Sequence, residues 1–234
     1  MHIFYHPQLV EKIGFLNEEE SKHCIQVLRM KVDDTMLIVD GMGGFYKAKI
    51  SSAHPKKCSF EIIESQQNYQ KRNFKINIAC APTKNIDRFE WFLEKATEIG
   101  IDSITPIICE NSERTLVKLD RLQKVLVSAM KQSIKAYLPL LNEAISFKQY
   151  ISNNAEIIGQ KFIAHCHDLP KSELKKQCLP NSESLILIGP EGDFSNQELK
   201  LAIENGFVPV SLSESRLRTE TAALVACHTF HLVQ

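Results

Sequence analysis

The sequence predicts an α/β protein in which a parallel sheet follows a smaller, β-rich domain. Residues 1–66 contain short runs of alternating apolar and polar residues that are separated by tight turns. Residues 65–73 (SQQNYQKRN) are polar and have no hydrophobic periodicity, which is typical of a linker. From residue 74 on, apolar runs of strand length alternate with amphipathic stretches of helix length, as in a parallel sheet covered on both faces. We therefore expect one domain over residues 1–66 and another over residues 74–234.

The first domain is expected to be a small barrel built from short strands. The segments MLIVDG (36–41), FYKAKISSA (45–53) and CSFEIIES (58–65) have the pattern of strands, and the glycines of GMGG (41–44) connect the first two tightly. One helix is expected near residues 18–28, because Asn17 is a good N-cap and acidic residues fill the first turn.

The second domain is expected to alternate strands and helices. It begins with a buried strand, FKINIACAP (74–82), and continues with an amphipathic helix over residues 87–100 that Gly100 ends. Further strands are expected at SITPIIC (103–109), KFIAHC (161–166), SLILIGP (184–190) and VPVSLS (208–213), and further helices at residues 119–133, 196–205 and 219–232.

Ligands of open parallel sheets bind beyond the carboxyl ends of the strands, and two such ends attract attention. The first is ILIGPEGDFS (186–195), where Gly189 and Gly192 allow close backbone approach to a ligand and Ser195 with Glu198 forms a capping box. A plain strand-to-helix turn fits this pattern equally well. Neither GxGxxG nor GxxxxGK[ST] is present, which speaks against a nucleotide phosphate loop.

The second is VSLSESRLRTETAALVAC (210–227), in which Arg216 and Arg218 precede a helix rich in small residues. Alanines 222, 223 and 226 let a ligand or another subunit pack closely against this helix. Two polar clusters follow other strands and are therefore expected at the same edge of the sheet. They are Thr83, Lys84, Asp87 and Arg88 after the first strand and Asn111, Ser112, Glu113 and Arg114 after the second.

Composition narrows the class of protein. The net charge is zero, but residues 67–135 hold 12 Lys and Arg against 8 Asp and Glu, so the middle third is basic and suits local phosphate contacts. We expect no metal site, because His165, Cys166 and His167 are consecutive on a strand and point to opposite faces. No segment is long and apolar enough for a membrane span, and no signal peptide is recognised. The seven cysteines are dispersed, which is typical of reduced thiols, so we expect a cytoplasmic protein without membrane contact.

Five ordered segments resemble a known family. IGPEGDFSNQEL and SRLRTETAAL are similar to the signature of RsmE-type small-subunit rRNA uridine methyltransferases of the SPOUT superfamily. KNIDRFEWFLEKATEIGIDSITPI, SERTLVK with AMKQS, and HCIQVLRMKVDD match further segments in the same order. The resemblance implies a PUA-like β-barrel that helps to bind RNA, a catalytic domain with a trefoil knot, and a homodimer. It also implies S-adenosylmethionine (SAM) as the cofactor and methylation of N3 of a uridine, position 1498, in 16S rRNA of the small ribosomal subunit.

The resemblance also implies roles for individual residues. The predicted catalytic residues are Arg218 and Glu220. Arg218 would stabilise the negative charge that develops on the target base, and Glu220 would have an orienting role. The predicted cofactor-binding residues lie in three loops and are Ala164, His165, Ile188, Gly189, Pro190, Glu191, Gly192, Ser211, Leu212, Ser213, Arg218 and Thr219. The predicted RNA-binding residues are Arg29, Lys84, Arg88, Arg114 and Lys131.

The chain departs from the family pattern at several positions. Asp193 and Ser213 stand where the family usually has glycine, and Lys135 stands where its QSGR segment has arginine. A side chain at position 213 is expected to crowd the cofactor. Two alternatives stay open at this point: a SPOUT methyltransferase that acts on another RNA, and an RNA-binding ribosome-assembly factor that has lost catalysis.

Overall fold

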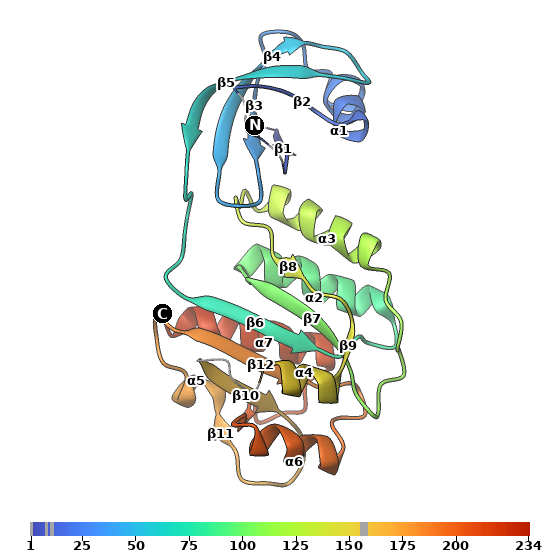
Figure 1. Cartoon of the computed structure of the whole chain (residues 1–234), viewed down its shortest axis with the longest axis vertical. Helices are drawn as coiled ribbons and strands as arrows, with labels where there is room; N and C mark the ends of the chain where they lie inside the picture. The colour runs from blue at the N-terminus through green and yellow to red at the C-terminus, as the bar shows by residue number, and fades with distance from the viewer. Residues whose placement is uncertain (1, 8, 10–11, 155–158) are drawn as a thin grey trace. The chain divides into compact units, whose positions relative to one another are not determined.

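The computed structural model describes residues 2–7, 9, 12–154 and 159–234. The chain divides into two compact units, which Figure 1 shows as ribbons. The first unit is Met1–Lys71 with Val127–Leu138, and the second is Arg72–Leu126 with Pro139–Gln234. Residues 127–138 therefore belong to the first unit, although they lie far from its other residues in the sequence and no sequence pattern indicated this.

The first unit is built on a five-stranded sheet in the order β1-β3-β4-β5-β2. β1 and β3 are parallel, and the other neighbours are antiparallel. Phe4, Met36, Ile38, Ile50 and Phe60 form its core with almost no exposure. The strands are β1 (Ile3–Tyr5), β2 (Ile13–Phe15), β3 (Thr35–Val39), β4 (Phe45–Ser52) and β5 (Ser59–Gln66).

One helical segment interrupts these strands, as the sequence predicted. The Asn17 carboxamide oxygen accepts a hydrogen bond from the Glu20 backbone N–H at 2.8 Å and caps α1 (Glu18–Lys22). The helix then continues as a π-helical turn, η1 (His23–Val27), which was not predicted. Arg29 follows with a φ of 56°, so the chain reverses through the left-handed region.

The second unit contains an eight-stranded sheet in which every pair of neighbours is parallel. The strand order is β11-β13-β10-β12-β6-β7-β8, and β9 also pairs with β7. The strands are β6 (Lys75–Cys80), β7 (Ser103–Ile108), β8 (Leu140–Leu141), β9 (Ile145–Ser146), β10 (Gln160–Ala164), β11 (Ser172–Glu173), β12 (Glu183–Ile188) and β13 (Val208–Ser211). The predicted parallel sheet is confirmed, and the short β8, β9 and β11 are additions to it.

Successive side chains of each strand point to opposite faces of this sheet, and helices cover both faces. On β10, Phe162 packs against Phe230 of α7, whereas Ile163 belongs to the core beneath α4 and α6. The helix α2 ends at Gly100, whose φ of 121° only glycine adopts readily, as predicted. The helices are α2 (Ile86–Ile99), α3 (Leu119–Gln132), α4 (Phe147–Asn153), α5 (Leu174–Gln177), α6 (Asn196–Glu204) and α7 (Thr219–Leu232).

The parallel arrangement places the carboxyl ends of β6, β7, β10, β12 and β13 at one edge of the sheet. The loops that follow these strands are therefore neighbours, and they carry the predicted site residues. The trefoil knot implied by the family resemblance stays a prediction. Within the described ranges, no helix has the length and apolar character that a bilayer crossing requires.

Candidate functional site

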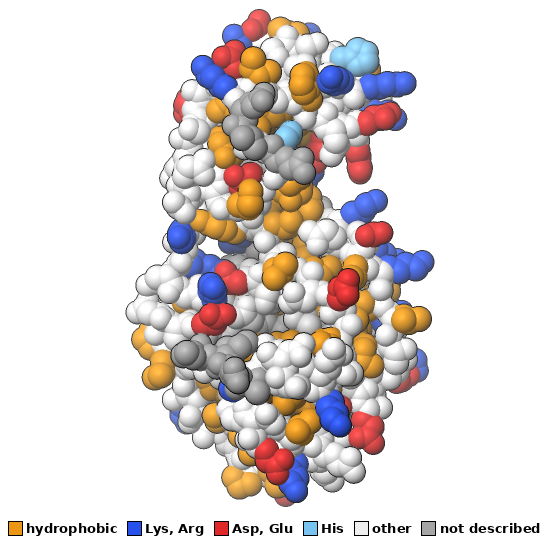
Figure 2. Space-filling model, viewed as in Figure 1, with side chains coloured by type: hydrophobic (Ala, Val, Ile, Leu, Met, Phe, Trp, Pro, Cys, Tyr) orange, Lys and Arg blue, Asp and Glu red, His pale blue; other side chains and the backbone are white. Residues whose placement is uncertain are grey.

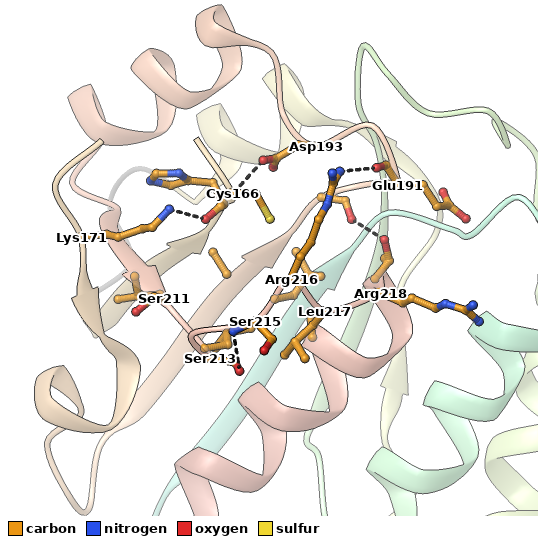
Figure 3. A pocket seen from close by; sticks show the side chains of 18 of the residues that line it. Cys166, Lys171, Glu191, Asp193, Ser211, Ser213, Ser215, Arg216, Leu217 and Arg218 are labelled. Atoms are coloured by element: carbon orange, nitrogen blue, oxygen red, sulfur yellow. Dashed lines mark hydrogen bonds between the residues drawn. The ribbon is translucent and has the colours of Figure 1, made fainter. Parts of the chain in front are cut away.

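A cavity of about 620 Å³ opens at this edge of the sheet (Figure 3). It lies between the loops that follow β10, β12 and β13, and the first turn of α7 forms part of its wall. Each loop comes from a strand of the central sheet, so the backbone on three sides of the cavity is held by strand pairing. A volume of this size accepts a ligand of several hundred daltons.

Eleven of the twelve predicted cofactor-binding residues line this cavity, and Gly192 does not. The eleven are Ala164, His165, Ile188, Gly189, Pro190, Glu191, Ser211, Leu212, Ser213, Arg218 and Thr219. The cavity wall also contains Cys166, which ends the first predicted loop (164–166), and Lys171, Asp193, Arg216 and Leu217, which were not in the predicted set. Lys171 lies several residues after the end of β10, and no sequence pattern indicated a role for it. Arg216 lies in the segment 210–227, which the sequence did indicate as a ligand-binding loop.

The two glycines of the GPEG turn serve packing inside the protein. A Cβ on Gly192 would lie 3.0 Å from the Asn111 Cβ, and a Cβ on Gly189 would lie 3.1 Å from the Phe194 ring. Neither glycine has a positive φ. The glycines therefore allow close approach to Asn111 and Phe194, and the predicted backbone approach to a ligand stays a prediction.

His165 is a buried polar residue in the cavity wall, with 6% of its surface exposed. Neither ring nitrogen has a hydrogen-bond partner within the part of the chain that the structure describes. Burial lowers the pKa of His165, and the nearby Lys171 lowers it further, so the ring is neutral at pH 7. A buried imidazole with two unsatisfied nitrogens is suited to a hydrogen bond with a bound ligand.

Asp193 ties two of the cavity loops together. Its Oδ2 accepts a hydrogen bond from the Cys166 backbone N–H at 2.7 Å (Figure 3), and its Oδ1 accepts one from the Phe194 N–H at 2.8 Å. The φ of Asp193 is 63°, a left-handed conformation that aspartate tolerates better than most residues. This conformation explains how aspartate replaces a glycine here, and its carboxylate is directed to the neighbouring loop.

Ser213 is an exposed residue on the rim of the cavity. Its hydroxyl accepts a hydrogen bond from the Ser215 backbone N–H at 3.2 Å (Figure 3), and its φ is not positive. The side chain is thus engaged with its own loop, and the backbone does not require glycine. The predicted crowding of a cofactor by Ser213 stays untested.

The loops after β6 and β7 join the same edge through a series of hydrogen bonds. The Lys84 backbone N–H donates to Glu191 Oε1 at 2.9 Å, and Arg114 Nη2 donates to the Lys84 carbonyl at 2.8 Å. Asn111 Nδ2 donates to the Asp193 carbonyl at 3.1 Å. The structure therefore brings together the two polar clusters and the GPEG turn.

A buried carboxylate lies beside this group of loops. Glu220 is 8% exposed, and its Oε1 lies 3.9 Å from Arg88 Nε. Its Oε2 has no hydrogen-bond partner among the described residues. Burial raises the pKa of the neighbouring Cys80 thiol well above its usual value, and the Glu220 carboxylate contributes to this shift. Arg218 precedes α7, and its side chain extends away from the cavity toward α2 (Figure 3).

The predicted RNA-binding residues divide between the two units. Lys84 and Arg88 lie beside the cavity, with the Lys84 ammonium 2.7 Å from Glu113 Oε2, and the Arg114 side chain donates hydrogen bonds to the loop after β6. Lys131 and Arg29 belong to the first unit. Lys131 is 2.6 Å from Glu20 Oε1, and both side chains are largely buried, so its charge is already paired.

Figure 2 shows one face of the molecule, on which Lys and Arg side chains alternate with Asp and Glu. No large area of a single sign covers this face, in agreement with the zero net charge. No three His, Cys, Asp or Glu side chains of the described ranges are grouped as they would be around a metal ion.

Two family models match this chain. The RNA methyltransferase domain model matches residues 70–231, and the RNA methyltransferase PUA domain model matches residues 16–63. Among curated proteins, ribosomal RNA small subunit methyltransferase E of Buchnera aphidicola subsp. Acyrthosiphon pisum is 30% identical over 220 residues. That match covers 91% of this chain and 85% of the relative.

Solved structures resemble the whole chain. The crystal structure of a probable rRNA-methyltransferase from Porphyromonas gingivalis has a TM-score of 0.92 and 39% identity, and the match covers 100% of this chain and 98% of that one. The ribosomal RNA small subunit methyltransferase E of Neisseria gonorrhoeae, bound to S-adenosyl methionine, has a TM-score of 0.88 and 25% identity. This second match covers 100% of this chain and 98% of that chain.

Proposed function

This chain belongs to the RNA methyltransferase family whose members carry a PUA domain, and from that premise we propose that it methylates N3 of a uridine in 16S rRNA. The uridine is the one at position 1498 of the small-subunit RNA. The observation that carries the proposal is the cavity at the carboxyl edge of the sheet, with the Glu220 and Arg88 pair beside it. Such a protein is a SAM-dependent rRNA methyltransferase.

The cavity fits SAM in size and in the chemistry of its wall. Ile188, Leu212 and Leu217 supply apolar surface for an adenine ring, and the loop backbone supplies donors and acceptors. The unsatisfied ring nitrogens of His165 supply a buried polar partner. When bound, SAM supplies a methyl group on a sulfonium sulfur, which is a reactive electrophile.

The residues beside the cavity suit the uridine. N3 of uridine carries a proton at neutral pH, and this proton must pass to solvent water or to a nearby carboxylate when N3 attacks the methyl group. Arg218 is assigned to stabilise the negative charge that develops on the base. Glu220, buried and 3.9 Å from Arg88 Nε, is assigned to orient the cationic side chains around it.

The backbone of the RNA is assigned to the cations near this site. Lys84 and Arg88 are exposed enough to reach phosphate groups, and Arg29 is exposed in the first unit. The Arg114 guanidinium donates to backbone carbonyls, and the Lys131 side chain is only 25% exposed beside Glu20, so we assign these two residues to support the fold around the RNA-binding residues. We also propose a homodimer and a cytoplasmic location. Of the three α7 alanines that were expected to allow close packing, Ala223 and Ala226 are buried in this chain's own core, and Ala222 is partly exposed.

Calorimetric titration with SAM, followed by methyl transfer to small subunits that lack the modification, tests this proposal. We expect binding and one N3-methyluridine at position 1498, mapped by mass spectrometry of RNase fragments. Binding followed by methylation of a different RNA would retain the enzyme class and reject the target. Binding without any transfer would favour the non-catalytic assembly factor, and no binding would reject the cofactor assignment.

The Arg218→Ala variant tests the assignment of roles. Because the Arg218 side chain extends away from the cavity, we expect SAM affinity within about tenfold of the wild type, or about 1.4 kcal/mol. Methyl transfer should fall below detection, because the developing charge loses its cation. Arg121→Ala is the control, since this arginine forms an ion pair with Glu90 on the surface of α2. Normal turnover in Arg218→Ala would contradict the catalytic role.

A further inference from the structure

Arg216 crosses the opening of the cavity. It lies in the loop that joins β13 to α7, and its side chain reaches to the opposite loop after β12 (Figure 3). There its Nη2 lies 3.4 Å from the Glu191 carbonyl oxygen. This distance is longer than the 2.7–3.2 Å of a good N–H···O bond, so the contact is weak and easily exchanged.

The other cations of the cavity wall are already engaged or directed elsewhere. The Lys171 ammonium donates to the His167 carbonyl at 2.7 Å and to the His165 carbonyl at 3.1 Å. The Arg218 side chain extends away from the cavity (Figure 3). Within the described ranges, the Glu191 carbonyl is the one hydrogen-bond acceptor of Arg216, although a guanidinium has five N–H donors. Arg216 is therefore the cation over the cavity whose donors are largely unused.

Two acidic side chains of the wall are engaged by groups other than Arg216. Asp193 accepts backbone hydrogen bonds through both of its oxygens, and Glu191 Oε1 accepts one from Lys84, whereas Glu191 Oε2 has no hydrogen-bond partner among the described residues. No carboxylate lies within ion-pair distance of Arg216 among the residues that the structure describes. An anionic group of a ligand would thus find Arg216 without competition from the protein.

We propose that Arg216 binds the carboxylate of the methionyl part of SAM and releases the Glu191 carbonyl when it does so. This inference rests on the proposed use of the cavity for SAM. The carboxylate is the only anionic group of that molecule, and a guanidinium binds a carboxylate through two parallel hydrogen bonds. Arg216 would then distinguish SAM from analogues that lack the carboxylate, independently of the methyl transfer step.

The test compares two ligands that differ in the carboxylate alone. Calorimetry measures the affinity of SAM and of decarboxylated SAM for the wild type, Arg216→Gln and Arg216→Lys. We expect Arg216→Gln to lose about tenfold or more in SAM affinity, as for a lost hydrogen bond to a charged group, and less than about twofold for decarboxylated SAM. Arg216→Lys should recover part of the SAM affinity, because an ammonium keeps the charge without the forked geometry.

Arg121→Gln is the control, because it removes the same charge from an arginine that pairs with Glu90 and is not among the residues that line the cavity. The inference is overturned if Arg216→Gln weakens both ligands equally, since Arg216 would then act on the loop itself. An unchanged SAM affinity in Arg216→Gln, or an equal loss in Arg121→Gln, overturns it as well. If the wild type binds neither ligand, the cofactor assignment has failed, which is a separate result from failure of the Arg216 contact. Arg216 is exposed, so equal urea midpoints will establish that the variants are folded.

Discussion

Replacement of Asp193 by glycine removes the hydrogen bonds of the carboxylate and also the strain of a side chain in the left-handed region. The carboxylate joins the loop after β12 to the Cys166 backbone N–H at 2.7 Å, and it is 17% exposed. A hydrogen bond to a charged group contributes about 1.5–3 kcal/mol, and partial exposure places this one near the lower limit. The left-handed φ of 63° acts in the opposite direction, because glycine would relieve about 1 kcal/mol of backbone strain.

The relief of backbone strain offsets only part of the lost stabilisation in Asp193→Gly, because the hydrogen bond from the Phe194 N–H is lost together with that from Cys166. We expect a loss of roughly 2 kcal/mol in urea unfolding, from the difference between the two contributions. The cofactor site should respond differently, because the loop after β10 loses its attachment to the neighbouring loop. An added ordering cost of about 1 kcal/mol on binding corresponds to a fall of roughly fivefold in SAM affinity.

Asp193→Ala serves as the companion variant. It loses the same hydrogen bonds and keeps the left-handed backbone, so it should be about 1 kcal/mol less stable than Asp193→Gly. The assay is urea denaturation followed by calorimetric titration with SAM for all three proteins. Equal or tighter SAM binding by Asp193→Gly would refute the role of the carboxylate in holding the cavity loops. Equal stability of the glycine and alanine variants would refute the argument from backbone strain.

Three further predictions concern other contacts. Burial lowers the pKa of His165, so below about pH 6.5 the unfolded chain binds a proton at this residue more readily than the folded chain does. The free energy of unfolding therefore falls as the pH falls. The difference between the urea midpoints at pH 7.5 and pH 5.5 should be smaller for His165→Asn than for the wild type. Lys131→Met should lose about 1–2 kcal/mol in urea unfolding, because Glu20 is left 12% exposed without its partner, whereas Lys49→Met breaks an exposed pair and should lose clearly less stability; equal losses would contradict the argument from burial. Gly14→Ala should destabilise the first unit, because the added Cβ would lie 2.4 Å from the Phe60 ring, and a wild-type melting temperature in this variant would mean that the ring moves aside without cost.

Sequence pattern alone located most of the secondary structure of the second unit. Helix α7 begins at Thr219, as predicted, and the capping box of Ser195 and Glu198 starts α6. Such elements depend on neighbours along the chain, through capping, side-chain periodicity and glycine stops. Strand polarity also placed the polar loops at a common edge, because all parallel strands point the same way.

The sequence determined, in this way, the order of the elements and the side of the sheet on which ligands bind. Only the tertiary structure decided that Gly192 packs against Asn111, that Asp193 holds Cys166, and that Arg216 covers the cavity while Lys131 pairs with Glu20. These contacts join residues far apart in the chain, and Glu20 with Lys131 is separated by 111 positions. Their geometry depends on packing and on the direction of single side chains, which hydrophobic periodicity and capping signals do not encode.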